Sequence, residues 1–195
     1  MNEYFDIYSS VIGTAPLDDY GIFAKQFEKR QECLKKYSFA IPDEEAIEKI
    51  SKYSPIIEIG AGSGYWSFLL KEAGVDVEAY DDGSWGWDTT WTTVLEGGPD
   101  TPMGNRNLFL CWPNYSTPFA YNCLKNFKGK YFIYIGEGSG GCTGDDDFHG
   151  YLDKNFKLID DYELPQWFGI HDRLCIFKRK KAPRRGPVRL HMPLN

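Results

Sequence analysis

The feature of this sequence that most constrains its fold is the stretch Pro55–Asp81, where an apolar run leads into regularly spaced glycines. The run Ile56–Ile59 is rich in β-branched residues and stops at a glycine, which is typical of a buried parallel strand. Residues 65–73 then carry apolar side chains at helical spacing, and Gly74 stands where a helix would end. An alternating pattern over residues 75–81 predicts a second strand. This order of elements predicts an α/β protein with a mostly parallel sheet.

The turn ahead of the predicted helix holds Gly60, Gly62 and Gly64 at every second position. Because glycine lacks a Cβ atom, such a backbone can take positive φ angles and approach a ligand closely, and the helix points its free N–H groups into the turn. Asp81 ends the second strand, where a carboxylate can accept hydrogen bonds from two ribose hydroxyls. The spacing excludes a dinucleotide fingerprint, whose third glycine is replaced by Tyr65, and a P-loop, which needs a Gly-Lys-Ser/Thr ending.

The segment Glu58-Ile-Gly-Ala-Gly-Ser-Gly64 resembles motif I of the class I S-adenosylmethionine-dependent methyltransferases, an acidic residue followed by xGxGxG. The resemblance implies a Rossmann-like methyltransferase sheet, mostly parallel with an antiparallel last strand, and S-adenosyl-L-methionine as the cofactor. It also implies that Asp81 binds the ribose and that the methionine part is surrounded by Glu58, Gly60, Ala61, Gly62 and Gly64. The alternative is a glycine-rich turn in another doubly wound protein.

A second segment of the same family's pattern follows the apolar run Leu108–Trp112, which predicts the fourth strand. In amino-methylating members this strand ends in Asp/Asn-Pro-Pro-Tyr/Phe. Here Pro113 and Tyr115 match, but Trp112 replaces the acid or amide and Asn114 replaces the second proline. Because the lost group would hold the target amine, base N-methylation in that manner is not expected. Trp112 still lies at the carboxyl edge of the sheet, where ligands of this fold bind, and is predicted to contact the cofactor.

The glycine-rich loop 136–149 follows a predicted fifth strand over Tyr131–Ile135 and therefore faces the same edge of the sheet. Its Glu137 and His149, with Tyr115 from the previous loop, are the predicted catalytic residues, because they can position or deprotonate a nucleophile. Three consecutive aspartates in this loop suit the first turn of a helix. The same acids with a histidine leave a metal site as an alternative, but none is predicted, because helix capping accounts for them more simply.

Helical spacing predicts amphipathic helices over Asp18–Tyr37 and from Asp43 to about Lys52. The first of these either covers the cofactor or only packs on the body, and residues 1–17 show little pattern. Three tryptophans between Asp81 and Thr92 form either a stacking wall for adenine or substrate, or a loop anchored by aromatics. These tryptophans are Trp85, Trp87 and Trp91.

The remaining predicted helices are one over Pro118–Phe127 and one ending at Leu152. The remaining predicted strands are Thr92–Leu95, Phe156–Ile159 and Asp172–Phe177, and the last two form an antiparallel hairpin around a turn at Asp160–Trp167.

The sequence divides into an N-terminal cap region (1–42), a methyltransferase domain (43–178) and a basic tail (179–195). Residues 178–195 carry seven Lys/Arg and no acid, whereas residues 1–177 carry 15 basic and 28 acidic residues, a net charge of −13. An acidic body is a poor platform for long nucleic acid, because phosphate contacts supply most of that affinity. A small-molecule acceptor is therefore favoured. The alternatives are an RNA or protein acceptor held by the tail, and a non-catalytic adenosylmethionine-binding module.

The five cysteines are odd in number and form no CxxC pair, which argues against a disulfide framework and against a zinc site. A reducing compartment follows, so the protein is expected in the cytoplasm, with the nucleus possible because of the basic tail. No apolar run approaches membrane-spanning length, and no membrane partner is expected.

Overall fold

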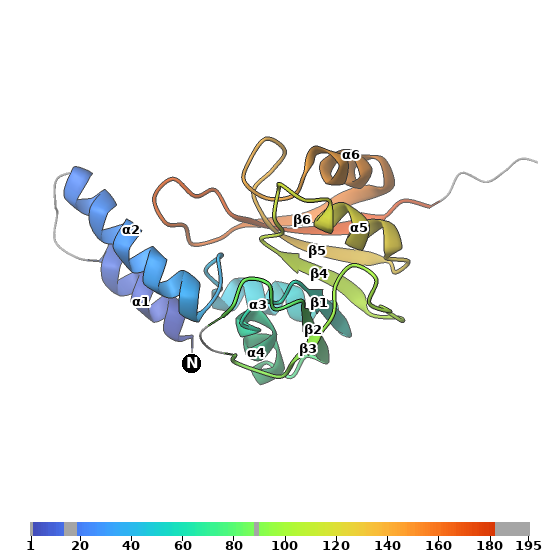
Figure 1. Ribbon diagram of the computed structural model, residues 1–195, viewed down its shortest axis with the longest axis horizontal. Helices are drawn as coiled ribbons and strands as arrows, with labels where there is room; N and C mark the ends of the chain where they lie inside the picture. Colours follow the sequence, from blue (N-terminus) through green and yellow to red (C-terminus); the bar gives the residue numbers. More distant parts are fainter. Residues whose placement is uncertain (1, 14–18, 88–89, 182–195) are drawn as a thin grey trace, which may run out of the picture.

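The computed structural model describes residues 2–13, 19–87 and 90–181. Its centre is a seven-stranded sheet with the order β3-β2-β1-β4-β5-β7-β6 (Figure 1). The strands β1 to β5 are mutually parallel, and β7 runs antiparallel to both of its neighbours. The predicted fold class is therefore confirmed. The strands are β1 Ile56–Ile59, β2 Val77–Asp81, β3 Val94–Glu96, β4 Asn107–Cys111, β5 Tyr131–Gly136, β6 Phe156–Glu163 and β7 Arg173–Arg179.

The strand order changes direction between β1 and β4. On one side of β1 the sheet continues with β2 and β3, and on the other side it continues with β4 and β5. In open α/β sheets such a switch point leaves a crevice at the carboxyl ends of the strands. Glu58 of β1 is in register with Ala79 of β2 and with Phe109 of β4. The end of β1 therefore lies at the centre of the expected binding edge.

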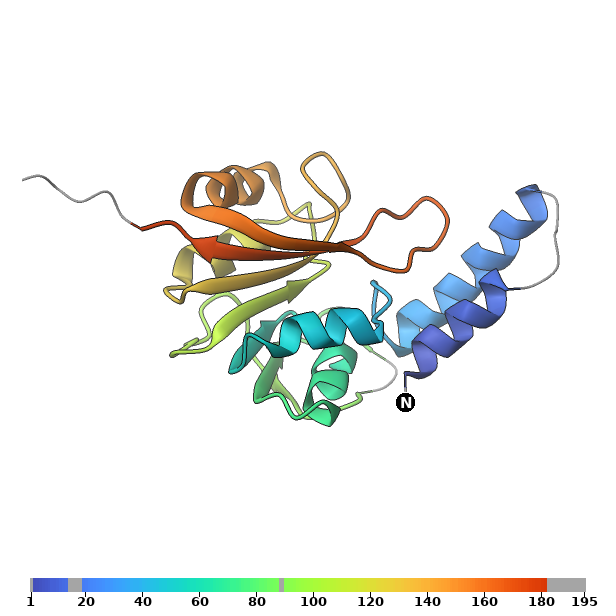
Figure 2. The ribbon, with the colours of Figure 1, turned by 180° about the vertical axis from the view of Figure 1, so that it is seen from behind.

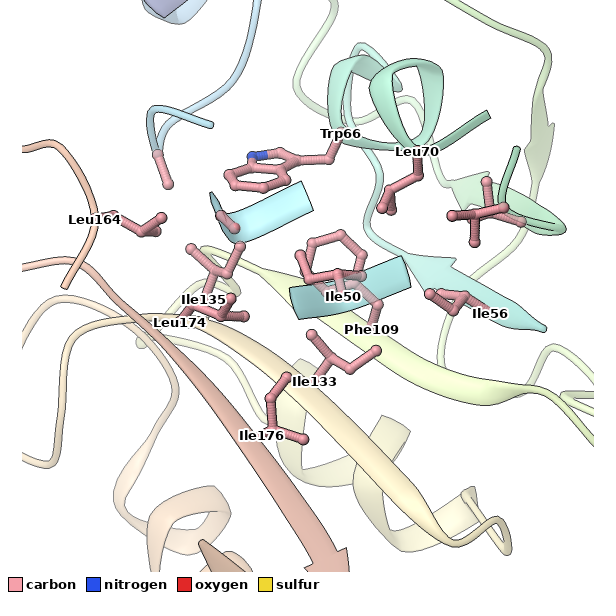
Figure 3. Close-up of a cluster of buried hydrophobic side chains, with 14 residues drawn as sticks. Ile50, Ile56, Trp66, Leu70, Phe109, Ile133, Ile135, Leu164, Leu174 and Ile176 are labelled. Carbon is pink, nitrogen blue, oxygen red and sulfur yellow. The ribbon is translucent and has the colours of Figure 1, made fainter. Parts of the chain in front are cut away.

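Four helices cover the two faces of the sheet, as the apolar runs of β1, β4 and β5 require. On one face, Ile56, Phe109 and Ile133 pack beneath α3 and α4 (Figure 3). On the other face, Ile57 and Phe132 pack beneath α5 and α6. The helices are α1 Glu3–Ile12, α2 Asp19–Lys36, α3 Glu44–Ser51, α4 Tyr65–Glu72, α5 Phe119–Asn126 and α6 Asp146–Asn155.

The helices α1 and α2 lie side by side, beyond the edge at which the parallel strands end (Figures 1 and 2). The sequence predicted α2 but not α1, which buries only Tyr4 and Val11. Tyr4 stacks on Tyr37 with ring centroids 5.2 Å apart, and its hydroxyl accepts a hydrogen bond of 3.0 Å from the indole of Trp167. Contacts with distant segments thus stabilise α1, although Tyr4, Tyr8 and Val11 also fall at helical spacing.

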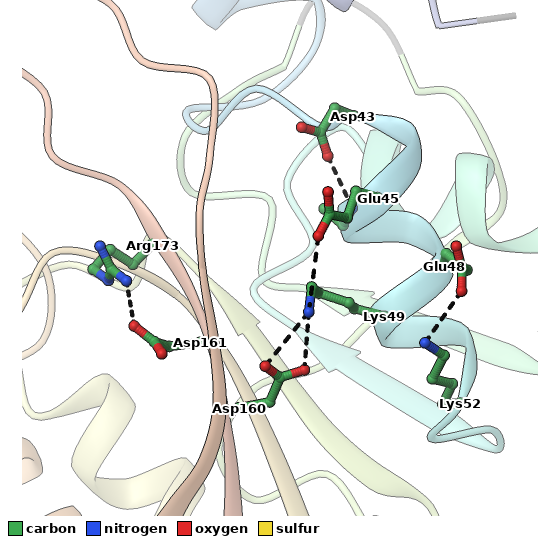
Figure 4. A network of polar contacts seen from close by, with 9 residues as sticks. Asp43, Glu45, Glu48, Lys49, Lys52, Asp160, Asp161 and Arg173 are labelled. Carbon is green, nitrogen blue, oxygen red and sulfur yellow. Dashed lines mark hydrogen bonds and ion pairs between the residues drawn. The ribbon is translucent and has the colours of Figure 1, made fainter.

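The predicted hairpin of β6 and β7 is confirmed, but the predicted turn at Asp160–Trp167 begins too early, because β6 continues to Glu163. Ion pairs across the exposed face replace apolar alternation in this part of the strand (Figure 4). Asp160 lies 3.1 Å from Lys49 of α3, and Asp161 pairs with Arg173 of β7. A strand with such a charged face carries no hydrophobic period that a sequence pattern could detect.

The strand β7 runs to Arg179, so the first residue of the predicted tail belongs to the sheet. The Arg179 guanidinium lies over the ring of Phe156 at 4.5 Å, and its Nε donates to the carbonyl oxygen of Gly129 at 2.9 Å. The predicted tail beyond residue 181, with three of the six Lys/Arg residues of the tail, lies outside the described residues.

Candidate functional site

The turn between β1 and α4 has the backbone shape that its glycines predict. Gly60, Gly62 and Gly64 have φ angles of 75°, 58° and 74°, in the left-handed region. A Cβ atom on Gly62 would lie 2.5 Å from the indole ring of Trp87, so no other residue fits there without movement. Gly64 is the N-cap of α4 and has no side chain to cap it; the first N–H of the helix, that of Tyr65, donates to the Ser63 hydroxyl at 3.3 Å instead.

The carboxylate of Asp81 joins the end of β2 to this turn. Its Oδ2 accepts a hydrogen bond from the Gly62 N–H and its Oδ1 accepts one from the Gly83 N–H, both at 2.8 Å. Each carboxylate oxygen has a second lone pair available for a ligand hydroxyl. Asp81 is therefore held in a fixed orientation beside the glycine turn, as a ribose-binding acid would need to be.

Glu58 is a buried acid near the end of β1, with 1% of its surface exposed. Its Oε2 accepts a hydrogen bond of 2.5 Å from the hydroxyl of Ser67 in α4. Burial raises the pKa of Glu58 to about 8, and the charge of nearby Asp81 acts in the same direction. A cation next to Glu58 would reverse this shift, so the site favours a ligand with a positively charged group.

A cavity of about 270 Å³ opens over these groups at the carboxyl edge of the sheet. Among its lining residues we call Glu58, Gly60–Gly62 and Asp81 the floor, and the aromatic residues Phe39, Trp85 and Trp87 the roof. The volume is close to the lower end of the roughly 300–1,000 Å³ typical of small-molecule sites. The predicted cofactor-binding residues that line it are Glu58, Gly60, Ala61, Gly62, Asp81 and Trp112; Gly64 caps α4 instead.

The roof is an aromatic cluster organised around Phe39, in the loop after α2. The Phe39 ring stacks on Trp112 at 5.2 Å and meets Trp85 and Trp87 edge-on at 5.3 and 6.0 Å. Two of the three tryptophans singled out in the sequence thus line the cavity, whereas Trp91 packs beneath α2, where its indole donates to the carbonyl oxygen of Lys36 at 2.7 Å. No motif in the sequence pointed to Phe39.

Trp112, which follows β4, is held in an unusual conformation. Its φ angle of 53° makes it a non-glycine residue in the left-handed region. Its indole Nε1 donates a hydrogen bond of 2.6 Å to Asp172, which is 1% exposed, and the Arg30 guanidinium lies 5.7 Å above the ring. Burial raises the pKa of Asp172 to about 7. Asp172 was predicted only as the first residue of the last strand, with no functional role.

The three predicted catalytic residues do not line the cavity. Tyr115 is 58% exposed. The carboxylate of Glu137 accepts hydrogen bonds from the Cys142 and His171 N–H groups at 2.7 and 3.1 Å, and the His149 ring lies 2.9 Å from a backbone oxygen of the same loop. In this structure Glu137 and His149 hold the loop after β5 together, and their catalytic role stays a prediction.

Two further residues line the inner part of the cavity without having been predicted, Trp66 and Cys111. Trp66 is 1% exposed, and its indole Nε1 has no hydrogen-bond partner among the residues that the structure describes. Burial raises the pKa of the Cys111 thiol, which therefore stays protonated. Across residues 2–13, 19–87 and 90–181, no group of three or more His, Cys, Asp or Glu side chains is arranged to hold a metal ion. None of the described helices has the length and apolar composition that a membrane crossing requires.

No protein-family model and no curated protein matches this sequence. Solved structures do resemble it. The magnesium protoporphyrin IX methyltransferase of Synechocystis PCC 6803 with bound S-adenosylhomocysteine is 10% identical, with a TM-score of 0.50 over 92% of this chain and 98% of that one. The 1,6-didemethyltoxoflavin N1-methyltransferase of Burkholderia thailandensis is 16% identical, with a TM-score of 0.49 over 86% and 93% of the two chains. A putative tRNA (m1A22) methyltransferase of Streptococcus pneumoniae is 11% identical, with a TM-score of 0.47 over 72% and 70%.

At these identities a structural match shows the fold alone, and the match at a TM-score of 0.50 is the one that supports it. The mostly parallel sheet with its reversed β7 agrees with this, since it is the arrangement that the motif I resemblance implied. The predicted resemblance is thus confirmed at the level of the fold: this chain has the fold of the class I S-adenosylmethionine-dependent methyltransferases.

Proposed function

We propose that this protein is an S-adenosylmethionine-dependent methyltransferase that acts on a small molecule. The observation that carries the proposal is the floor of the cavity, where Glu58, the glycine turn and Asp81 converge at the switch point of the sheet. Support also comes from the structures with the same fold, among which the Synechocystis enzyme was crystallised with S-adenosylhomocysteine.

The floor residues fit the parts of this cofactor. Asp81 would accept hydrogen bonds from the ribose hydroxyls, and Glu58 would accept from the ammonium group of the methionine part. The positive φ angles of Gly60 and Gly62 let the backbone approach the ligand closely. When bound, S-adenosylmethionine supplies an activated methyl group. The protein then has to orient an acceptor in line with it, and good alignment can lower a barrier by roughly 7–11 kcal/mol.

The cavity wall suggests what kind of acceptor fits. Phe39, Trp85 and Trp87 line the cavity with aromatic surface, and flat apolar molecules stack on such rings. The ionisable groups that line the cavity are Glu58, Asp81, Asp82 and Cys111, and the first two are assigned to the cofactor. Without a well-placed general base, the site suits an acceptor atom that is a nucleophile in its neutral form or that loses its proton to water.

An RNA acceptor is the second candidate, because one structure with this fold belongs to a putative tRNA methyltransferase and because the C-terminal residues are basic. The acidic body disfavours it, since binding to RNA depends on neutralising phosphates. The two candidates differ in salt dependence. Transfer to RNA should fall steeply as salt rises and when residues 181–195 are deleted, whereas transfer to a neutral small molecule should change little.

Two measurements test the proposal. Calorimetry should show binding of S-adenosylmethionine and S-adenosylhomocysteine and no binding of NAD. Labelled methyl groups from S-adenosylmethionine should then appear in a fraction of small metabolites rather than in RNA or protein. Binding of NAD with no response to the other two ligands would contradict the cofactor assignment, and label only in macromolecules would contradict the acceptor class.

A further inference from the structure

Arg30 of α2 is a half-buried cation that forms no ion pair. Its Nε atom is shielded from solvent and has no hydrogen-bond partner among the described residues. The ion pairs in the described part of the chain engage other basic side chains, and none of them includes Arg30. Such a cation is unusual in a chain with 28 acidic and 22 basic residues. Because a shielded donor without an acceptor costs free energy, an anion beside Arg30 would stabilise it.

Two neighbours of Arg30 compensate its charge only in part. The guanidinium lies 5.7 Å from the centre of the Trp112 ring, and a ring face attracts a cation but cannot accept the parallel pair of hydrogen bonds that a carboxylate accepts. Burial raises the pKa of Asp172 to about 7, and the charge of Arg30 opposes that shift. The carboxyl group of Asp172 bonds to Trp112 instead, and near neutral pH it carries only part of a negative charge. Neither neighbour therefore takes the place of an anion.

The position of Arg30 connects it with the proposed methyl-transfer site. The Trp112 ring beneath the guanidinium also lines the cavity, although Arg30 itself is not a lining residue. The guanidinium thus lies against the Trp112 wall of the cavity, on a helix that stands beyond the edge where the parallel strands end (Figure 1). A ligand that occupies the cavity and extends past Trp112 would meet it.

The face of α2 that carries Arg30 is exposed and aromatic further along the helix. Phe27 and Phe23 precede Arg30 by about one and two turns, so the three side chains share one face. Phe23 and Phe27 stack with ring centroids 6.0 Å apart and are 42% and 54% exposed. Phe168, which is 65% exposed, meets Phe23 edge-on at 5.5 Å from the loop between β6 and β7, which reaches towards α2 (Figure 2). We call Phe23, Phe27 and Phe168 the aromatic face, which extends roughly 10 Å along α2 from Arg30.

We propose that the methyl acceptor is an apolar carboxylic acid, whose carboxylate pairs with Arg30 and whose apolar part lies on the aromatic face. The planar guanidinium matches a carboxylate through two parallel hydrogen bonds, and contiguous exposed rings favour an apolar occupant. Both features share one helix face that continues from the wall of the cavity, which favours one molecule over two separate ligands. The inference rests on the proposed function and names the chemical class of its acceptor. Arg30 is then the residue that selects for that class.

The experiment uses the parent protein, labelled S-adenosylmethionine and a pool of small metabolites separated on an anion exchanger at neutral pH. Label should enter compounds from the retained acids, and not the neutral or basic compounds that pass through. Treating the retained acids with phosphatase should leave the transfer unchanged. Converting their carboxylates to amides with a carbodiimide and ammonia should abolish it, because the amide carries no charge for Arg30.

Arg30→Met keeps the aliphatic stem of the side chain and removes its charge. Its rate of transfer to the retained acids should fall roughly 10- to 100-fold, the range expected for a hydrogen bond to a charged group. Once the labelled compound is purified, this loss should appear in KM rather than in kcat. Arg30→Lys, which keeps the charge without the planar fork, should recover part of it.

The matched control is Lys29→Met, which removes the neighbouring cation of α2, one that is paired with Glu32. Its rate of transfer should stay within about twofold of the parent, because exposed ion pairs contribute little. The affinity for S-adenosylhomocysteine, measured by calorimetry, should stay within about threefold in all three variants, since none of these side chains lines the cavity.

Phe27→Ser tests the other half of the proposal, since it removes an exposed ring of the aromatic face. It should raise the KM of the same acid roughly fivefold, because apolar area is lost from the contact. If the parent self-associates in sedimentation or binds phosphatidylglycerol vesicles, and Phe27→Ser abolishes either, the aromatic face has another occupant. Either result would overturn the assignment of that face to the acceptor.

Label only in compounds that pass through the exchanger, or equal rates in the parent and Arg30→Met, would overturn the inference and leave the proposed function intact. Loss of transfer after phosphatase treatment would identify a phosphate and overturn the carboxylate. Equal losses in Arg30→Met and Lys29→Met would show a general effect of charge, and an equal loss of cofactor affinity in Arg30→Met would make Arg30 a structural residue; both overturn the inference. Absence of label in every small metabolite would overturn the proposed function, and the inference with it.

Discussion

The floor and the roof of the cavity are built in different ways. The floor residues Glu58, Gly62 and Asp81 sit at strand ends or in the turn between them, and backbone or side-chain hydrogen bonds of 2.5 to 2.8 Å fix them. The roof residues Phe39 and Trp85 come from loops and meet through ring contacts, and Trp85 is 62% exposed. Hydrogen-bonded strand ends hold one geometry, whereas ring contacts between loops allow rearrangement. The difference fits a fixed cofactor site beneath an adaptable acceptor site.

The largest effect is expected from a side chain added to the floor. Gly62→Ala puts a Cβ atom on a backbone with a φ angle of 58° and 2.5 Å from Trp87. We expect the affinity for S-adenosylhomocysteine to fall on the order of 100-fold in calorimetry, from backbone strain and loss of close approach together.

The matched control for that variant lies in the roof loop. Gly86→Ala has a similar φ angle of 68°, but its Cβ atom would meet nothing within 4 Å. It should cost roughly 1 kcal/mol of stability and leave the affinity within a few-fold. Equal losses of affinity in both variants would remove the distinction between floor and roof.

The second effect concerns the acid of the floor. Asp81→Ala removes the carboxylate that faces the cavity beside Gly62, and should weaken binding of S-adenosylhomocysteine roughly 30-fold, or about 2 kcal/mol. Asp82→Ala is the control, because Asp82 also lines the cavity but its carboxylate accepts from the Ser84 N–H. A larger loss for Asp82→Ala than for Asp81→Ala would mean that the ribose contact is assigned to the wrong residue.

The third effect is a dependence of binding on pH. Because the pKa of Glu58 is raised to about 8 in the free protein, binding an ammonium group beside it must release a proton at lower pH. The affinity for S-adenosylhomocysteine should therefore rise as pH rises, by about tenfold between pH 6.5 and 7.5. Methylthioadenosine, which lacks the ammonium, should bind equally at both values. Any slope that survives in Glu58→Gln belongs to the ligand itself, and a full slope there would contradict the role of Glu58.

The sequence predicted the floor because its signals are local. The acid, the glycines and the start of α4 lie within Glu58–Tyr65, and turn geometry follows from glycine chemistry. The mostly parallel sheet with an antiparallel last strand followed from the same motif through the resemblance that it carries. The roof was only half predicted, since Trp85 and Trp87 stood out by composition, whereas Phe39 reaches Trp112 through tertiary contacts alone.

The helix and the site residue that the sequence did not predict share one physical cause. The helix α1 is held by Tyr4 against Tyr37 and Trp167, and Asp172 matters because β7 lies beside the end of β5. Each of these contacts joins segments far apart in the sequence, and no pattern within one segment reports them. The predicted catalytic residues Glu137 and His149 were placed on the correct edge of the sheet, but their hydrogen bonds are made within their own loop and its neighbour.

The fourth effect is confined to the roof. Phe39→Ala removes the ring on which Trp112 stacks and around which Trp85 and Trp87 meet. Stacked aromatic pairs contribute about 0.5–1.5 kcal/mol beyond their buried area, so the KM for the acceptor should rise by roughly fivefold. The affinity for S-adenosylhomocysteine should stay within about threefold, because the floor is untouched. A loss of cofactor affinity larger than the change in KM would make Phe39 part of the cofactor site.

The last effect is on stability rather than on binding and concerns Asp172, which accepts the hydrogen bond of the Trp112 indole. The folded protein raises the pKa of Asp172 from 3.8 to about 7, so between these values the folded state holds a proton that the unfolded state has lost. The contribution of this group to stability therefore falls as pH rises through that window. Asp172→Asn keeps an oxygen for the Trp112 indole and removes the titration, so its stability relative to the parent should increase from pH 5 to pH 8 by roughly 2–3 kcal/mol in urea unfolding. The exposed Asp153 gives a matched control for the substitution itself, as Asp153→Asn. If the parent and Asp172→Asn lose stability in parallel as pH rises, the carboxyl group of Asp172 is ionised throughout and another group holds Trp112 in place.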